Sequence, residues 1–141
     1  MGWLTNQRRI FLPDKVRIVF LMIAVGAFWL TEFGRYVYRP FVRSNGIQDF
    51  GLADSIGNLG GIIVQIFFVC AVINPEKNQS YRWAAFLSAG YIVYEFVQPY
   101  LPKGVFDWKD IFGTLIGFVI SLILLGIIWS KFPARQEMEN N

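Results

Sequence analysis

The sequence predicts an all-α membrane protein with four transmembrane helices. Of the 141 residues, 55% are hydrophobic and only 16% are charged, a balance that is too apolar for an ordinary small soluble domain. Aromatic residues make up 18% of the chain, which suits lipid contact and interfacial belts. A bilayer core of about 30 Å requires roughly 20 apolar residues in a helix. The segments that meet this requirement are residues 16–38, 52–73, 81–97 and 108–129.

The four segments differ in how strongly each one predicts a transmembrane span. Residues 108–129 are the strongest prediction, and residues 81–97 are the shortest and most polar segment. Their length and the absence of alternating polarity favour helices over strands. Proline and glycine separate the segments, with Pro40 in the first break expected to stop the first helix. We expect a single four-helix transmembrane domain at residues 1–132 and a polar C-terminal tail at 133–141.

Lysine and arginine are distributed unequally between the two ends of these spans. If both termini lie on one side, that side holds eight of these residues and the other side holds five. Cytoplasmic loops carry an excess of Lys and Arg, so we expect both termini in the cytoplasm. No small-residue cleavage site follows the first apolar run, which favours a retained span over a cleaved signal peptide. Most acidic residues then lie at the extracytoplasmic ends of the spans.

Two stretches repeat one polar pattern. The sequence "DSIGNLGGIIVQ" begins at Asp54, and "DIFGTLIGFVIS" begins 56 residues later at Asp110. Upstream, "EFGRYVYRP" at Glu32 is similar to "EFVQPYLP" at Glu95. This pattern predicts a tandem repeat of two helical hairpins, related by a pseudo-two-fold axis along the membrane normal. Chance similarity between apolar segments is the alternative interpretation.

Each copy of the pattern contains two glycines four residues apart. Such small-xxx-small pairs let two helix backbones approach closely, so we expect the second and fourth spans to cross there. Asn58 and Thr114 follow the first glycine of each copy and supply hydrogen-bonding groups beside the groove. The two pairs are Gly57 with Gly61 and Gly113 with Gly117.

The acidic residues at the helix ends have different expected partners. Asp54 and Asp110 fall in the first turns of their helices, where a carboxylate caps free N–H groups. Glu32 and Glu95 lie near C-terminal ends, where the helix dipole disfavours an anion. Arg35 follows Glu32 by three residues, a spacing that allows an ion pair.

Glu95 has only Gln98 at the same spacing. We expect Arg39, Arg43 or Lys103 to approach Glu95 across the outer loops. An ionisable group so close to a bilayer needs a partner and is a functional candidate. Structural ion pairing and a ligand or proton site are both open interpretations.

The stretch "EFVQPYLPKGVFDWKDIFGTLIG" contains an E-x-x-Q element at Glu95 and Gln98, then a short Pro/Gly loop. Acids follow at Asp107 and Asp110, and a glycine at Gly117. This order of elements resembles the VanZ-like family of small bacterial membrane proteins. The second half of the chain carries most of the resemblance, and the four-span layout agrees loosely.

The chain departs from the VanZ-like pattern at two positions. Lys103 is the loop cation where the family usually has arginine, and Thr114 stands where the family has asparagine. The resemblance implies an integral protein of the bacterial inner membrane with a role at the cell envelope. The family's general biochemical activity is unclear, so the resemblance implies no mechanism.

Several kinds of chemistry are disfavoured by composition. The chain has no histidine and a single cysteine, Cys70, which removes His-based acid–base chemistry and nearly every zinc site. The net charge of +3 comes without a polybasic run, so no nucleic acid is expected. No metal motif or cofactor motif is present, and an intramembrane enzyme is the least favoured of the functions considered.

The sequence therefore favours a binding or accessory role at the cell envelope, with the bilayer as one partner. The ligand would be an anionic lipid, a lipid-linked envelope molecule or another membrane protein. The sequence is also compatible with a homodimer. The alternatives are a small proton-coupled transporter using Glu32 or Glu95 and a purely structural subunit of a membrane complex. The candidate polar cluster consists of Glu32, Arg35, Asp54, Asn58, Glu95, Gln98, Asp107, Asp110 and Thr114.

Overall fold

The computed structural model describes residues 15–102 and 104–132, which fold into helices without strands. The all-α prediction is therefore confirmed for the described residues. Lys103 and the predicted C-terminal tail lie outside them. The elements are α2 (Lys15–Phe33), the π-helix η1 (Gly34–Tyr38), α3 (Arg39–Ser44), α4 (Leu52–Ile73), α5 (Lys77–Val97), the 3-10 helix η2 (Gln98–Tyr100) and α6 (Trp108–Lys131).

The observed helices follow the predicted segments, with one correction at the first break. Helix α4 has the predicted bounds, α5 begins four residues before the predicted residue 81, and α6 ends two residues beyond 129. The stop expected at Pro40 is wrong, because the helical path continues through η1 and α3 to Ser44. Proline lacks an N–H and its ring crowds the carbonyl four residues earlier. The wider π-turn just before Pro40 accommodates this defect.

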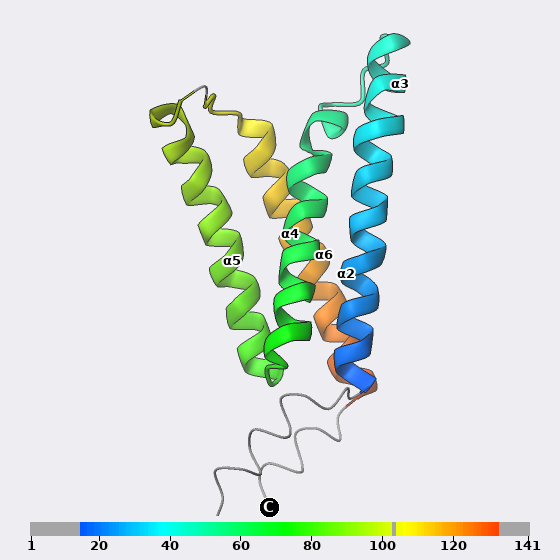
Figure 1. Ribbon diagram of the computed structural model, residues 1–141, viewed down its shortest axis with the longest axis vertical. Coiled ribbons are helices and arrows are strands. Elements are labelled where there is room, and N and C mark those ends of the chain that lie inside the picture. The colour runs from blue at the N-terminus through cyan, green and yellow to red at the C-terminus, as the bar shows by residue number, and fades with distance from the viewer. Residues whose placement is uncertain (1–14, 103, 133–141) are drawn as a thin grey trace, which may run out of the picture.

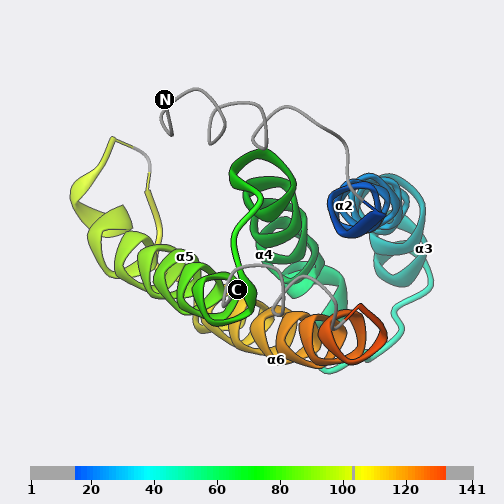
Figure 2. The same ribbon diagram turned by 90° about the horizontal axis from the view of Figure 1, so that it is seen from below.

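The bundle is arranged around α4. The largest helix contact joins α4 to α6, followed by α2 with α4 and α5 with α6. Figure 1 shows α2 and α5 rising from one end, while α4 and α6 start at the other end beside α3. Residues 45–51, 98–102 and 104–107 therefore lie at the same end, which we call the α3 end. Seen along the bundle, α5 and α6 form one side and α2 lies across α4 from α5 (Figure 2).

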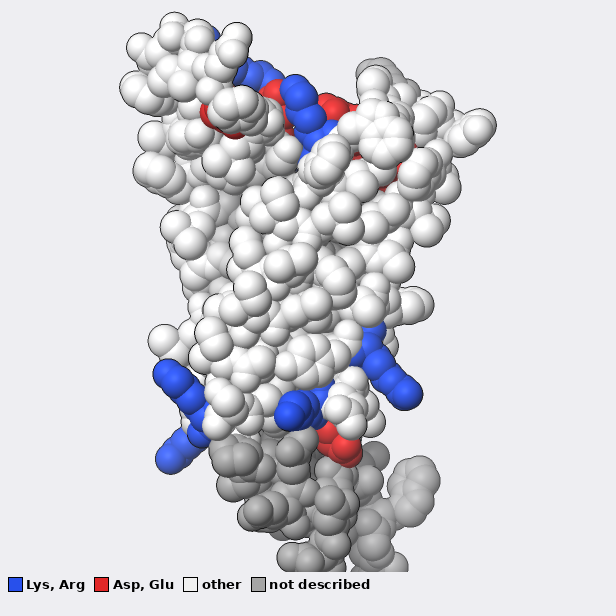
Figure 3. Space-filling model, turned by 180° about the vertical axis from the view of Figure 1, so that it is seen from behind, with Lys and Arg blue, Asp and Glu red and all other residues white. Residues whose placement is uncertain are grey.

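Three helical segments are long and apolar enough to cross a membrane, namely Lys15–Ser44, Leu52–Ile73 and Trp108–Lys131. Figure 3 shows a broad band without charged residues between two charged ends. Large apolar side chains such as Met22, Leu30 and Phe86 are 68%, 71% and 70% exposed, as expected for lipid contact. These features are those of an integral membrane protein. Helix α5 does not reach the same hydropathy, so the fourth span stays a prediction.

Glycines set the close approach of the helices, but the two predicted pairs do not meet each other. A Cβ on Gly113 would lie 2.6 Å from the carbonyl oxygen of Ser55, and a Cβ on Gly117 would collide with the Leu59 carbonyl. Both glycines of α6 thus pack directly on the α4 backbone. Gly57 instead faces Arg35, and Gly61 faces the Tyr91 hydroxyl.

The two glycines that bring α2 and η1 onto α4 were not predicted. Gly34 packs against Ile56, and Gly60 packs against Thr31, in each case too closely for a Cβ. The α4 surface therefore meets η1 through Ile56, meets α2 through Gly60, and meets α6 through Ser55 and Leu59. The tandem repeat of two hairpins stays a prediction.

Candidate functional site at the α3 end

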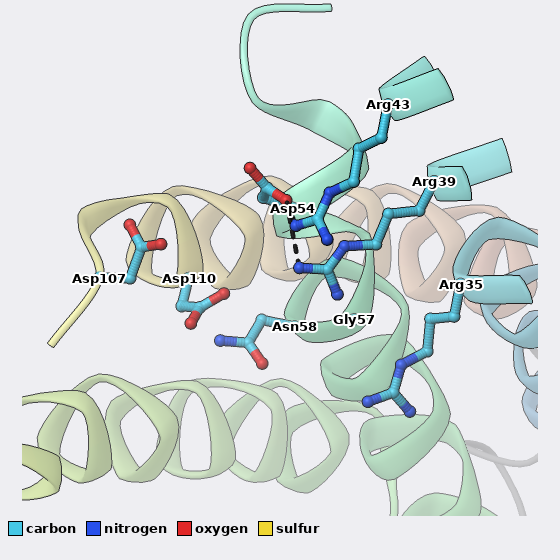
Figure 4. Close-up of a pocket in the computed structure, with 8 residues that line it drawn as sticks. All are labelled: Arg35, Arg39, Arg43, Asp54, Gly57, Asn58, Asp107 and Asp110. Atoms are coloured by element: carbon cyan, nitrogen blue, oxygen red, sulfur yellow. Dashed lines mark hydrogen bonds and ion pairs between the residues drawn. The ribbon is translucent and has the colours of Figure 1, made fainter. Parts of the chain in front are cut away.

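A ladder of arginines lines one wall of the α3 end. Arg35 comes from η1, and Arg39 and Arg43 come from α3. In a regular α-helix, residues four apart drift by about 40° around the axis, and the wider turn of η1 reduces this drift. Figure 4 shows Arg39 and Arg43 directed toward Asp54 at the start of α4, with Arg35 farther from Asp54 along the same wall. This wall exists only because the helix continues past Pro40.

Asp54 joins the arginine wall to the two central helices. Its Oδ1 accepts hydrogen bonds from Arg39 Nη2 at 3.1 Å and from Arg43 Nη2 at 2.8 Å. Its Oδ2 accepts a hydrogen bond from Lys109 Nζ at 2.8 Å. One carboxylate thus connects α3, α4 and α6, and three cations surround it.

The helix caps are not the predicted ones. Asp49 accepts hydrogen bonds from the backbone N–H groups of Gly51 at 3.1 Å and Ala53 at 2.6 Å. Asp107 is the N-cap of α6 and accepts from Lys109 N at 2.9 Å. Asp54 and Asp110 were expected to be caps, but each is the third residue of its helix. In both cases an acid before the helix accepts from N–H groups at its start, Asp49 from a position two residues ahead of the N-cap Gly51 and Asp107 as the N-cap itself. Each third-residue carboxylate is therefore available for other contacts.

Asp110 faces the arginine wall across a polar pocket (Figure 4). Within residues 15–102 and 104–132, no hydrogen bond or ion pair reaches its carboxylate. The pocket has a volume of about 320 Å³, and we call it the arginine pocket. Its lining residues are Arg35, Arg39, Arg43, Asp54, Gly57, Asn58, Asp107 and Asp110.

Glu95 is buried beside this pocket, with 3% of its surface exposed. Its Oε1 accepts a hydrogen bond from Asn58 Nδ2 at 3.2 Å. With the Gln98 amide nitrogen turned toward its acceptors, that nitrogen donates to Glu95 Oε2 at 3.0 Å and to the Val105 carbonyl at 2.6 Å. The expected pairing of Glu95 with Arg39 or Arg43 is wrong, because both arginines bind Asp54 instead. Neutral amides therefore hold this carboxylate.

A second pocket adjoins the first between α4, α5 and α6, and we call it the tyrosine pocket. Its volume is about 340 Å³. Asn58 and Asp110 line both pockets, so the two are contiguous at these residues. The lining of the tyrosine pocket is Asn58, Gly90, Tyr91, Tyr94, Glu95, Gln98 and Asp110.

Two residues of the predicted polar cluster lie apart from both pockets. Glu32 forms an ion pair with Arg35 at 3.5 Å, as its spacing indicated. Thr114 is fully buried, and its hydroxyl donates to the Asp110 carbonyl at 2.9 Å. The remaining members, Arg35, Asp54, Asn58, Glu95, Gln98, Asp107 and Asp110, line one pocket or the other.

Several pocket residues lie outside the cluster predicted from the sequence. Arg39 and Arg43 continue the four-residue spacing that begins at Arg35, and this spacing was a usable signal. Tyr91 precedes Glu95 by four residues and therefore shares its helix face, and Tyr94 stands directly before Glu95. Among the described residues, no group of three His, Cys, Asp or Glu side chains could hold a metal ion.

Comparisons with protein-family models, with curated proteins and with solved structures find no match to this chain. The resemblance to the VanZ-like family therefore rests on the residues quoted above, and it enters the functional argument only as a proposal.

Proposed function

We propose that this chain is an integral protein of the bacterial inner membrane that binds a phosphate-bearing headgroup in the arginine pocket. The role would be that of a binding or accessory protein of the cell envelope, as the resemblance to the VanZ-like family implies. The observation that carries the proposal is the wall of Arg35, Arg39 and Arg43 along a pocket of about 320 Å³. Arginine is favoured wherever planar, bidentate recognition of phosphate matters.

The arginines retain donors for a ligand after their contacts with Asp54. A guanidinium has five N–H donors, and Arg39 and Arg43 each use Nη2 for the Asp54 carboxylate. Within the described residues, Arg39 Nε is buried and has no hydrogen-bond partner. A buried unsatisfied donor costs free energy, and an oxygen of a bound phosphate would remove this cost. Asp54 meanwhile fixes the two guanidinium groups in position before the ligand arrives.

The opposite wall offers acceptors rather than donors. Asp107 and Asp110 line it, and the Asn58 amide lies between the two walls (Figure 4). Carboxylates accept hydrogen bonds from hydroxyl and amino groups. The pocket therefore suits a headgroup that combines a phosphate with hydroxyl or amino groups, such as a glycerol or sugar phosphate.

The membrane placement is part of the proposal. Helix α5 would be the fourth span, since it packs along α6 and exposes Phe86, Val93 and Phe96 on its outer side. With both termini in the cytoplasm, the α3 end faces the extracytoplasmic side, where envelope lipids and lipid-linked precursors are displayed. Arginines at this level would meet headgroup phosphates.

Binding of phosphatidylglycerol to the purified chain in detergent tests the proposal. Arg43→Gln should weaken binding about tenfold, because a charge-assisted hydrogen bond contributes roughly 1.5–3 kcal/mol. Arg82→Gln is the matched control, since Arg82 is exposed in the first turns of α5 at the opposite end. Equal affinity of the Arg43 variant, the Arg82 variant and the unaltered chain would overturn the proposal and favour a structural subunit.

A proton-coupled transporter is the second candidate, and the burial of Glu95 favours it. Glu95 is held by neutral amides and is 3% exposed, and an intramembrane carboxylate without a cation is a candidate proton carrier. In liposomes with an internal pH dye, added glycerol phosphate should then drive acidification that Glu95→Gln abolishes. If the unaltered chain produces no acidification, the transporter function is excluded and the binding proposal stands.

A further inference from the structure

We infer that the ligand is a membrane lipid that enters sideways, with its headgroup in the arginine pocket and the upper part of its hydrocarbon chain in the tyrosine pocket. The inference rests on the proposed function and names the source of the phosphate. A lipid is preferred over a soluble phosphate ester for three reasons, which concern the continuity, the lining and the openness of the tyrosine pocket.

The two pockets form one continuous path. Asn58 and Asp110 line both the arginine pocket of about 320 Å³ and the tyrosine pocket of about 340 Å³. A headgroup bound by the arginines thus reaches the boundary between the two pockets at the Asn58 amide. A soluble phosphate ester would fill only the first pocket, whereas a molecule with a long tail can occupy both.

The lining changes along the path in the order in which a lipid changes. Charged residues surround the arginine pocket. Asp110, Asn58, Glu95 and Gln98 then present hydrogen-bonding groups to the headgroup hydroxyls and the glycerol backbone. Gly90 lies five residues earlier on α5 than Glu95, which places it about 7.5 Å farther along the helix axis. At this depth Gly90 and Tyr91 remain as lining.

With the membrane placement proposed above, the tyrosine pocket opens toward lipid and not toward water alone. Gly90 and Tyr94 are exposed on the side of the bundle, and Tyr94 is 52% exposed. A Cβ on Gly90 would meet no atom within 4 Å. Tyrosine combines an apolar ring with a polar tip and is favoured at the membrane interface. A lipid can therefore enter between α4 and α5 without leaving the membrane.

Gly90 allows the chain subsite to be blocked without disturbing the fold. In Gly90→Leu the new side chain would occupy the tyrosine pocket, and the open space at this position leaves the helix packing unchanged. Gly26→Leu is the matched control, because Gly26 also has no atom within 4 Å of a Cβ and lies exposed on α2. Gly26 lines neither pocket.

The test measures two ligands on each variant, dioleoyl phosphatidylglycerol in detergent micelles and its soluble headgroup glycerophosphoglycerol. Gly90→Leu should weaken lipid binding about tenfold, corresponding to a loss of roughly 1.4 kcal/mol, and leave headgroup binding unchanged. Gly26→Leu should change neither. Unaltered lipid binding by Gly90→Leu overturns the inference, and it leaves the proposed function standing if Arg43→Gln still weakens both ligands.

A second measurement on the unaltered chain covers the case of a misfolded Gly90 variant. Phosphatidylglycerol with a photoreactive group in the upper part of one chain should crosslink to residues 90–94, as located by mass spectrometry of the digested protein. Crosslinks confined to the outer surface of α2 would overturn the inference. If Arg43→Gln has no effect on either ligand, the proposed function fails, and the inference fails with it.

Discussion

The hairpins α2–α4 and α5–α6 carry similar acids near the α3 end but surround them differently. In the first hairpin, Glu32 pairs with Arg35, and Asp54 is bound by Arg39, Arg43 and Lys109 at 2.8–3.1 Å. In the second hairpin, Glu95 is held by the amides of Asn58 and Gln98, and within the described residues Asp110 has no ion pair. The basic residues that make these pairs come mainly from the first hairpin.

This difference indicates that the two hairpins contribute different groups to the pockets. Acids paired with cations fix neighbouring groups in place, as Asp54 fixes the guanidinium groups that line the arginine pocket. A carboxylate without a cation near a bilayer is costly unless it serves a ligand or a proton. The first hairpin therefore supplies most of the donors in fixed positions, and the second supplies carboxylates that form no ion pair within the described residues.

The glycines give the largest expected contrast between the hairpins. Gly113→Ala should destabilise the fold by about 1–3 kcal/mol, because overpacking forces backbones apart and the new Cβ would lie 2.6 Å from the Ser55 carbonyl. Gly57→Ala, at the equivalent position, should change stability by less than about 0.5 kcal/mol, since its nearest neighbour is Arg35 Nε at 3.7 Å. Thermal unfolding in one detergent measures both.

Equal destabilisation by these two alanines would show that the glycine pairs of α4 and α6 act alike. Such a result would contradict the packing described above, in which Gly113 lies against the α4 backbone and Gly57 does not lie against α6. Gly126→Ala provides a reference for the general effect of alanine in α6, because the nearest atom to its Cβ, the Tyr81 hydroxyl, lies at 3.6 Å.

The third-residue aspartates give an intermediate contrast. Asp54→Asn should lower the free energy of unfolding by about 1 kcal/mol, because it weakens three partly exposed ion pairs. Asp110→Asn should leave stability unchanged or raise it slightly, since Asp107 stands three residues earlier and like charges at this spacing repel. Chemical denaturation at low and high salt checks both, and only the Asp54 effect should shrink with salt. A larger loss from Asp110→Asn would reveal a structural role for that carboxylate.

The helix bounds could be predicted because apolar length decides them. Residues 52–73 are apolar for the length of a span, and α4 occupies these residues from Leu52 to Ile73. The stop predicted at Pro40 was wrong because a proline interrupts a regular α-helix. The π-turn that tolerates this proline depends on backbone geometry that cannot be predicted from residue types. The arginine wall was missed with it, although the spacing of Arg35, Arg39 and Arg43 was visible.

The capping residues were misassigned for a local reason. Asp107 and Asp110 stand three residues apart in "DWKD", and an acid three residues after a capping residue is itself a start signal. The predicted start at residue 108 agrees with α6, and only the choice of Asp110 over Asp107 as the capping acid was wrong. The hydrogen bond between Glu95 and Asn58 could not be predicted from the sequence. Asn58 lies 37 residues away, and only the packing of α4 on α5 brings the two residues together.

The glutamates give the smallest and most specific contrast, and it concerns the ligand. Glu95→Gln should weaken binding of phosphatidylglycerol about threefold, the loss expected for one weak hydrogen bond to a headgroup hydroxyl. It should leave phosphatidic acid unaffected, because that lipid has no such hydroxyl. Glu32→Gln should not distinguish the two lipids, since Glu32 lies outside both pockets and pairs with Arg35. Titration of each variant with both lipids measures the difference, and a Glu95 variant that weakens both equally would place Glu95 in the support of the pocket rather than in contact with the headgroup.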